Sequence, residues 1–397
     1  MNVFKSEYFK INYNYLKLLG LWPNENHSRK KFKRITVIFL IISLLIPQYI
    51  RLFEEWGRDV DIVIELIGSI FYFTGSQMKY MSFVRVESKM SFIFEEISRH
   101  WNTLTDAKEQ KLLREYGRYG RIIALGYIIP INIILVVYIT VPLAPAVLDI
   151  IDPLNESRPK AFPYFAQYFI DDQKYYFELT IHGWIVCILS VQIYATFDTT
   201  YQLCMQHVCA LFSIVENRIR EANKLSWRGN SNSDHEIQMR DRSYERMVQA
   251  VVLHKEAMRF IGLIEECYTF VYSYVVLANT LLLSLTAVDT MLNFEKGNIK
   301  QMIRLGMLYI GFSFHLLYNM NPGQNVIDSS VHIQEAAFHT NWYDSSSKTK
   351  QLLRIIMMRS RRPCKLTANG VVTLNLETFA FVFKKSISYV AVIGSVR

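Results

Sequence analysis

The chain has 397 residues, of which 51% are hydrophobic and 14% aromatic, and its formal net charge is +9. This length allows two or three soluble domains, but the high apolar fraction and the positive mean hydropathy are typical of a membrane protein with basic loops. A nucleic-acid-binding protein is not indicated, because no basic stretch is interleaved with aromatic residues that could stack on bases.

The first 34 residues predict a cytoplasmic N-terminal segment. The first 20 residues contain Lys5, Glu7 and Lys10 and no apolar core before a small-residue cleavage site, so we expect no cleavable signal. A basic run from Arg29 to Arg34 directly precedes the first long apolar stretch. Positive residues beside a span favour the cytoplasmic side, which predicts an N-terminus inside the cell.

Seven apolar segments follow, and most reach the ~20 residues that a helix needs to cross a hydrocarbon core. The first is short and contains Pro47, and the last is only moderately hydrophobic. The loops at 83–121, 201–261 and 321–370 are basic, whereas the alternate loops are acidic or nearly neutral. We therefore predict an all-α, seven-transmembrane helical protein with its N-terminus in the cytoplasm and its C-terminus outside. The predicted spans are residues 35–52, 60–82, 122–146, 178–200, 262–288, 302–320 and 371–396.

The basic loops themselves follow helical spacing. Ile93, Ile97 and Trp101 recur at intervals of four, which predicts helices that continue past the membrane into a cytoplasmic anchor bundle. The organisation that follows is a cytoplasmic N-terminal segment at 1–34, transmembrane helices one to six with their loops at 35–320, a cytoplasmic loop with an amphipathic anchor helix at 321–370, and a final transmembrane helix at 371–397.

The predicted outer loop at 147–177 carries a sequon that begins at Asn155, so Asn155 is a candidate glycosylation site. The five cysteines fall in predicted helices or in a cytoplasmic loop, and no extracellular disulfide is expected.

Ionisable residues inside predicted spans are candidates for function. Lys79 lies near the end of the second span, where we expect it to snorkel to the headgroups. Asp198 is expected to be wet near the inner end of the fourth span, and His315, deep in the sixth, is expected to have a packing role.

Sites for metals, cofactors and catalysis are not predicted. Cys204, His207 and Cys209 are close in sequence, but their spacing does not place all three on one helix face. The sequence contains neither a glycine-rich phosphate loop nor a Gly-x-Ser-x-Gly nucleophile elbow, so nothing in it favours an enzyme.

The stretch from Trp342 to Arg397 contains two unusual helices. A basic amphipathic helix ends before Pro363, and its apolar and basic residues predict an intersubunit contact. The final segment mixes Thr373, Asn375 and several serines with Phe, Val and Ile, which is typical of a helix between lipid and water and thus of a pore lining. A packing helix whose serines bond to neighbouring helices fits the same residues equally well. The predicted assembly residues are Leu352, Leu353, Arg354 and Ile356.

Both ends of the chain resemble one family. Trp342-Tyr343, the Arg-Ser-Arg-Arg-Pro run at 359–363 and the sequence from Leu376 to Tyr389 resemble the C-terminal signature of insect odorant receptors, and Gly20-Leu21-Trp22-Pro23 resembles their N-terminal region. The resemblance implies an odorant-specific subunit of an odorant-gated, non-selective cation channel that forms tetramers with a shared co-receptor subunit. It also implies the plasma membrane of olfactory sensory neuron dendrites.

The resemblance further implies a ligand pocket in the outer halves of the spans, where aromatic and soft side chains suit a small, mostly apolar ligand. Ordinary helix packing explains most of these residues individually. The candidates for ligand binding are Ile70, Phe71, Phe73, Thr74, Ile134, Tyr138, Leu179, His182, Ile303 and Met307. By the same resemblance, the pore constriction corresponds to Val392, Ser395 and Val396.

Two alternatives remain at this point. A gustatory-type receptor channel is the first. A seven-span G-protein-coupled receptor is less favoured, although Asn321-Pro322 at the inner end of the sixth span invites it, because the basic N-terminus is predicted to lie inside.

Overall fold

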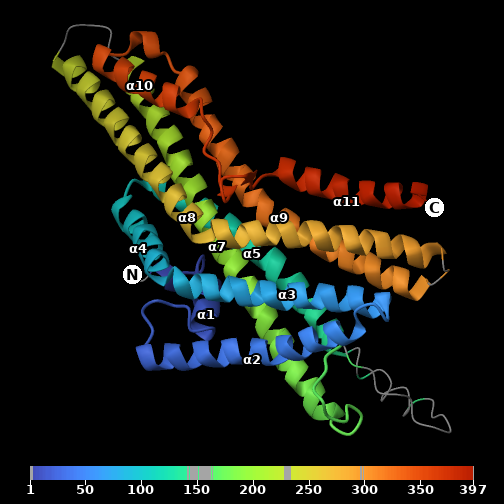
Figure 1. Ribbon diagram of the computed structural model, residues 1–397. Helices are drawn as coiled ribbons and strands as arrows, with labels where there is room; N and C mark the ends of the chain where they lie inside the picture. Colours follow the sequence, from blue (N-terminus) through green and yellow to red (C-terminus); the bar gives the residue numbers. More distant parts are fainter. Residues whose placement is uncertain are drawn as a thin grey trace.

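The computed structural model describes residues 3–140, 164–227, 234–295 and 299–396, together with positions 143, 151, 162 and 297. Long helices dominate this part of the chain, and a single two-stranded hairpin interrupts them (Figure 1). The predicted all-α, seven-transmembrane fold class is confirmed. The elements are η1 (Val3–Lys5), α1 (Lys10–Leu18), α2 (His27–Glu55), α3 (Val60–Arg85), α4 (Glu87–Thr103), α5 (Ala107–Thr140), α7 (Tyr176–Trp227), α8 (Asp234–Glu295), α9 (Ile299–Phe338), η3 (Trp342–Asp344), α10 (Ser347–Ser360), β1 (Thr367–Ala368), β2 (Val372–Thr373) and α11 (Leu376–Val396).

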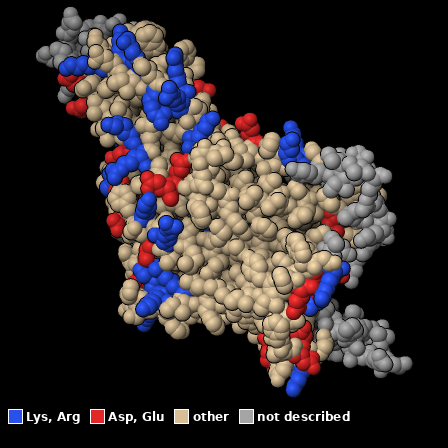
Figure 2. Space-filling view, viewed as in Figure 1, with Lys and Arg blue, Asp and Glu red and all other residues tan. Residues whose placement is uncertain are grey.

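Several helices are suited to crossing a membrane. Among the described residues, four helices combine sufficient length with sufficient apolar character, namely α2, α5, α7 and α8. The three remaining predicted spans lie in α3, α9 and α11. A broad area without charged side chains covers the middle of the face shown in Figure 2, and lysines and arginines border it on the left. This pattern is what a hydrocarbon core and a basic membrane surface require.

Two helices extend far beyond that apolar area. α7 has 52 residues and α8 has 62, whereas about 20 residues suffice to cross the hydrocarbon core. Their extensions rise together with α10 away from the other helices (Figure 1), and α10 packs against both α8 and α9. Ile93 and Ile97 of α4 are completely buried, as their spacing predicted. The buried side chains of the extensions are continuous with the single apolar core of the described chain.

The N-terminal segment packs on α4 through aromatic side chains. The ring of Trp22 stacks on Phe94 at a centroid distance of 5.4 Å, and Phe4 contacts both rings edge-on. Gly20 has a φ of +67°, a backbone conformation that favours glycine. The Gly-Leu-Trp-Pro motif thus turns the chain after α1 and anchors it with a buried indole.

The start of the last helix corrects the sequence prediction. α11 begins at Leu376, not at residue 371, because Asn369 and Gly370 both have positive φ and form the turn of the β1–β2 hairpin. An Asn-Gly pair favours a hairpin turn because both residues readily adopt positive φ, and here residues 369–371 join the paired positions Ala368 and Val372. Thr373 consequently lies in a strand, and the side chain of Asn375 accepts a hydrogen bond of 2.9 Å from the backbone N–H of Thr378 at the helix start.

α9 contacts the segment before α11 at backbone distance. The helix runs from Ile299 to Phe338 without interruption through Pro322. A Cβ atom on the following residue, Gly323, would lie only 1.9 Å from the carbonyl oxygen of Leu374. Only a residue without a side chain permits this contact, which joins α9 to the base of the last helix.

Candidate functional site

A buried ion pair links α3 to α7. The ammonium nitrogen of Lys79 lies 2.5 Å from a carboxylate oxygen of Asp198, and neither side chain has any exposed surface. Lys79 also lies over the ring of Tyr194, at 4.3 Å from its centroid. Isolated charges are very costly in such surroundings, so each of these two groups depends on the other.

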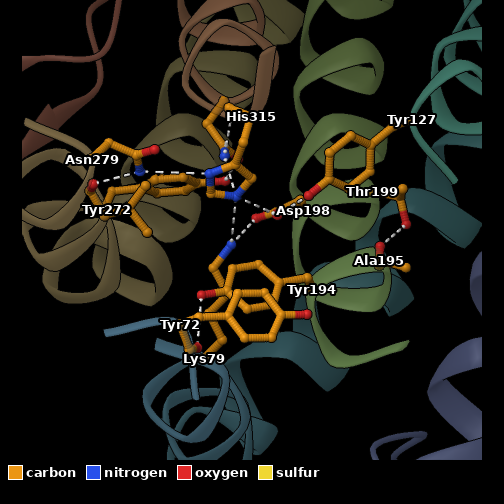
Figure 3. A network of polar contacts seen from close by, with 12 residues as sticks. Tyr72, Lys79, Tyr127, Tyr194, Ala195, Asp198, Thr199, Tyr272, Asn279 and His315 are labelled. Atoms are coloured by element: carbon orange, nitrogen blue, oxygen red, sulfur yellow. Dashed lines mark hydrogen bonds and ion pairs between the residues drawn. The ribbon is translucent and has the colours of Figure 1, made fainter. Parts of the chain in front are cut away.

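Further polar groups complete the network around Asp198. Its second carboxylate oxygen accepts a hydrogen bond of 2.9 Å from the hydroxyl of Tyr127 and lies 3.2 Å from Nε2 of His315. The amide nitrogen of Asn319 lies 3.0 Å from the same His315 nitrogen, and Tyr272 donates to the Asn319 side chain at 3.1 Å. Figure 3 shows Lys79, Asp198 and His315 converging from separate helices. The network thereby connects α3, α5, α7, α8 and α9.

Stacked aromatic side chains lie beside the network. Tyr72 and Tyr194 stack at 5.0 Å with nearly parallel rings, and the Tyr194 hydroxyl donates to the backbone carbonyl of Tyr72 at 3.1 Å. A Cβ atom on Gly75 would lie 2.5 Å from the Tyr194 hydroxyl and 3.1 Å from the ring of Tyr274. These rings are therefore held close to α3 by the absence of a side chain at position 75.

Two of the sequence expectations for these residues are wrong. Lys79 does not snorkel, and Asp198 is not wet, because the two groups neutralise each other in the interior. His315 packs as expected, but it does so as a member of the polar network. The sequence feature that could have indicated this ion pair is the presence of opposite charges, Lys79 and Asp198, in two different predicted spans.

The structure divides the predicted ligand-binding residues into groups. Ile70, Phe73 and Leu179 are buried, and Phe71, Thr74 and His182 are partly buried. His182 lies between Ser43 at 2.8 Å and the Tyr168 hydroxyl at 3.1 Å. Three other predicted residues, Ile134, Tyr138 and Met307, are exposed on the surface of the chain. The side chain of Ile303 lies outside the described part of the structure.

Two partly buried members of this set lie on α3, the helix that carries Lys79. Thr74 precedes Lys79 by five residues on α3, which is about 7.5 Å along a helix. Phe71 lies one turn further along and stacks on Tyr274 at 6.3 Å. The side chain of Ile134, in contrast, lies on the surface of the single chain.

The other predicted sites are described only in part. The pore candidates Val392, Ser395 and Val396 lie on the backbone of α11, but their side chains are outside the described residues, and so is Asn155. Ser386 of α11 is buried, and its hydroxyl lies 2.9 Å from the Tyr309 hydroxyl of α9. At this position the helix shows the packing role that serines can have between membrane helices.

The predicted assembly helix turns part of its predicted face inward. In α10, Leu353 and Ile356 are buried within the chain, Leu352 is partly buried, and Arg354 is exposed. The large apolar side chains that α10 does expose are Ile355 and Met358.

A second cluster of titratable groups lies on α4 and the extensions of α7 and α8. The imidazole nitrogens of His100 and His207 lie 3.0 Å apart, and Glu256 lies 3.4 Å from the other nitrogen of His100. Burial, with a contribution from the neighbouring Arg99, lowers the pKa of His100 below its usual value of 6.5. No group of three or more potential metal ligands occurs among the described residues.

Comparison with known proteins identifies a family with this architecture. Residues 60–387 match the family model described as "7tm Odorant receptor". The chain is 31% identical over 87 residues to Odorant receptor 49a of Drosophila melanogaster, covering 22% of each chain. It is 24% identical over 148 residues to the odorant receptor coreceptor of Aedes aegypti, covering 36% of this chain and 30% of that one. These two alignments thus span less than a third of the length of each relative.

A solved structure covers the whole fold. The insect olfactory receptor OR5 from Machilis hrabei, in complex with eugenol, superposes on 99% of this chain and 100% of its own, with a TM-score of 0.77 and 15% sequence identity. At this identity the likeness establishes the arrangement of the helices. The matched family consists of receptors, not enzymes.

Proposed function

Since the chain belongs to the 7tm Odorant receptor family, we propose that it is the odorant-binding subunit of a ligand-gated, non-selective cation channel. The observation that carries this proposal is the family match over residues 60–387. The buried, aromatic surroundings of α3 and α7 support it, because they suit a small and mostly apolar ligand. This match favours an odorant receptor over the gustatory-type channel and the G-protein-coupled receptor.

The proposed ligand site lies between the predicted outer end of the bundle and the polar network. Ile70, Phe73 and Leu179 supply buried apolar surface, and Phe71 and Thr74 lie beside them. Tyr194 borders this region and also contacts Lys79. A ligand that displaces the stacked aromatic rings would therefore act directly next to the charged groups. The exposed residues Ile134 and Met307 are better suited to contact lipid or another subunit.

The proposed route from the ligand to the pore follows α9. His315 fixes α9 to the network, and Gly323 lies eight residues further on, about 12 Å along the helix. There the backbone of α9 contacts Leu374, immediately before the last helix. A tilt or rotation of α9 about its contact with the network would thus move the base of α11, on which we propose that Val392, Ser395 and Val396 form the constriction. The odorant drives this shift only to the extent that it binds the open state better than the closed state.

We further propose assembly with an odorant receptor co-receptor subunit in a heterotetramer, in the plasma membrane of olfactory sensory neuron dendrites. The membrane location itself agrees with the family and with the apolar helices. α10 supports the assembly proposal because it exposes Ile355 and Met358 next to basic residues. Aspartate at both positions should abolish co-purification with the co-receptor, whereas unchanged co-purification would exclude this face as the contact.

Electrical recording tests the proposed function directly. The chain should be expressed with and without a co-receptor subunit, and odorant-evoked current should require the chain and depend on its pocket. Gly75→Ala, which presses on the Tyr194 hydroxyl, should change odorant sensitivity. Gly68→Ala is the matched control on the same helix, because its Cβ would meet only one side-chain atom at 4.0 Å. Equal effects of the two variants, or the same odorant responses with the co-receptor alone, would contradict the proposal.

A further inference from the structure

An open cleft lies between the N-terminal segment and α5. Its volume is about 310 Å³, and its lining consists of Glu7, Tyr8, Arg118, Arg121, Ile122 and Leu125. Its residues come from the N-terminal segment and from positions 118–125 of α5, and none of them belongs to the proposed odorant site. A volume in this range is sufficient for a small-molecule group.

The cleft lies where the surface of α5 changes from charged to apolar. Arg118 is exposed, and one turn later Ile122 is 59% exposed. Beyond it, Ile129 and Ile133 are exposed as well, so the outer surface of the helix is continuously apolar from Ile122 onward. In a membrane-spanning helix, this boundary coincides with the level of the lipid phosphates.

The back wall of the cleft is fixed by close packing. A Cβ atom on Gly117 would lie 3.2 Å from the ring of Tyr8, so Tyr8 rests directly against the backbone of α5. Its ring also packs on Trp101 at a centroid distance of 5.5 Å. The cleft is therefore a formed feature of the surface with a defined aromatic wall.

The charges around the cleft are two cations and one anion. A guanidinium nitrogen of Arg121 lies 3.3 Å from a carboxylate oxygen of Glu7, and both side chains are partly exposed. Within the described parts of the chain, Arg118 has no ion-pair partner. Guanidinium groups bind phosphate oxygens strongly, and a carboxylate beside them is the natural partner of an ammonium group.

We propose that this cleft binds the headgroup of an aminophospholipid. The lipid comes from the membrane leaflet on the same side as α4 and the N-terminal segment. Arg118 and Arg121 hold the phosphate, Glu7 accepts hydrogen bonds from the primary amine, and Ile122 and Leu125 contact the start of the acyl chains. The combination of charges selects against phosphatidylglycerol, which has no amine. It also selects against phosphatidylcholine, whose quaternary ammonium has no N–H to donate.

Native mass spectrometry of the purified receptor assembly, reconstituted with lipids of defined headgroup and released from detergent, tests this proposal. Phosphatidylethanolamine and phosphatidylserine should be retained over phosphatidylcholine and phosphatidylglycerol. Arg118→Gln should lower this retention by about tenfold, the usual effect of losing a charge-assisted hydrogen bond. Arg114→Gln is the matched control, because Arg114 is exposed one turn further from the apolar surface and does not line the cleft.

Glu7→Gln provides an independent test of the amine contact. It should remove the preference for amine headgroups and preserve phospholipid retention, because the arginines remain. Equal retention of all four lipids by the natural chain would overturn the proposal, and so would equal losses in Arg114→Gln and Arg118→Gln. Equal retention of soluble glycerophosphoethanolamine and of phosphatidylethanolamine would overturn the membrane as the source of the ligand. Cross-linking of Arg118→Cys to another subunit would assign this face to a protein interface instead.

Discussion

Removing the carboxylate of Asp198 tests whether the buried network holds the helices together. Asp198→Asn leaves the Lys79 ammonium in a site with no exposed surface and no opposite charge. Breaking a buried pair in this way costs about 3–5 kcal/mol. With roughly 1–2 °C per kcal/mol for a chain of this size, the melting midpoint should fall by roughly 3–10 °C.

The partner substitution should be milder. In Lys79→Met, Asp198 keeps the Tyr127 hydroxyl and His315 as neighbours, so the loss should be about 1–3 kcal/mol. In the double variant no charge of the pair remains unpaired. It should therefore be at least about 1.5 kcal/mol more stable than Asp198→Asn alone.

Fluorescence-detected melting of detergent-solubilised protein measures these differences. Glu115→Gln is the control, because it removes a carboxylate from an exposed pair with Lys111 at 3.8 Å and should change stability by less than about 1 kcal/mol. The reasoning is refuted if Asp198→Asn melts like the natural chain. It is also refuted if the double variant loses the full sum of the two single losses.

Three further predictions concern other parts of the chain. Gly323→Ala should uncouple odorant binding from current, because its methyl group would collide with the Leu374 carbonyl; normal odorant-evoked current from a correctly delivered variant would exclude this contact as the link. Thiol reagents applied from outside should block Ser395→Cys channels more than Phe383→Cys channels, and equal insensitivity would remove α11 from the conduction path. Because burial lowers the pKa of His100, the folded chain favours the neutral ring, while the unfolded chain takes up a proton as the pH falls through about 6.5. The stability that depends on neutral His100 is therefore complete above this pH and is lost below it, so the fall in melting midpoint between pH 7.5 and 5.5 should be smaller in His100→Gln.

Helices and their buried faces could be predicted from the sequence because both are local properties. The spacing of Ile93 and Ile97 alone identifies the face that α4 buries. The sequence also contained a local indication that α11 begins after residue 371, because Asn369-Gly370 is typical of a hairpin turn. The apolar residues that follow this pair fit a helix as well as a strand, so they were assigned to the helix.

The partners across the bundle could not be predicted in the same way. Lys79 and Asp198 are 119 residues apart, and Asp198 and His315 are 117 apart. Periodicity states which face a residue occupies but not which helix covers that face. A single charge near the end of a span also fits snorkelling, and only the arrangement of α3 against α7 decides between the two.

The free energy needed to separate the Lys79–Asp198 ion pair limits how the proposed channel can open. Allosteric coupling between two sites is typically about 1–3 kcal/mol, whereas separating a buried ion pair costs about 3–5 kcal/mol. A small odorant therefore supplies too little differential binding energy to break the contact between Lys79 and Asp198. In the proposed mechanism, the network therefore remains intact in both states and acts as the fixed point about which α9 moves. The moving contacts are instead those that cost little to change, namely the stacked rings of Tyr72 and Tyr194 on one side and the backbone contact at Gly323 on the other. On this reasoning, Asp198→Asn lowers stability and current together, whereas Gly323→Ala, whose methyl group must displace the Leu374 carbonyl, lowers current and preserves odorant binding.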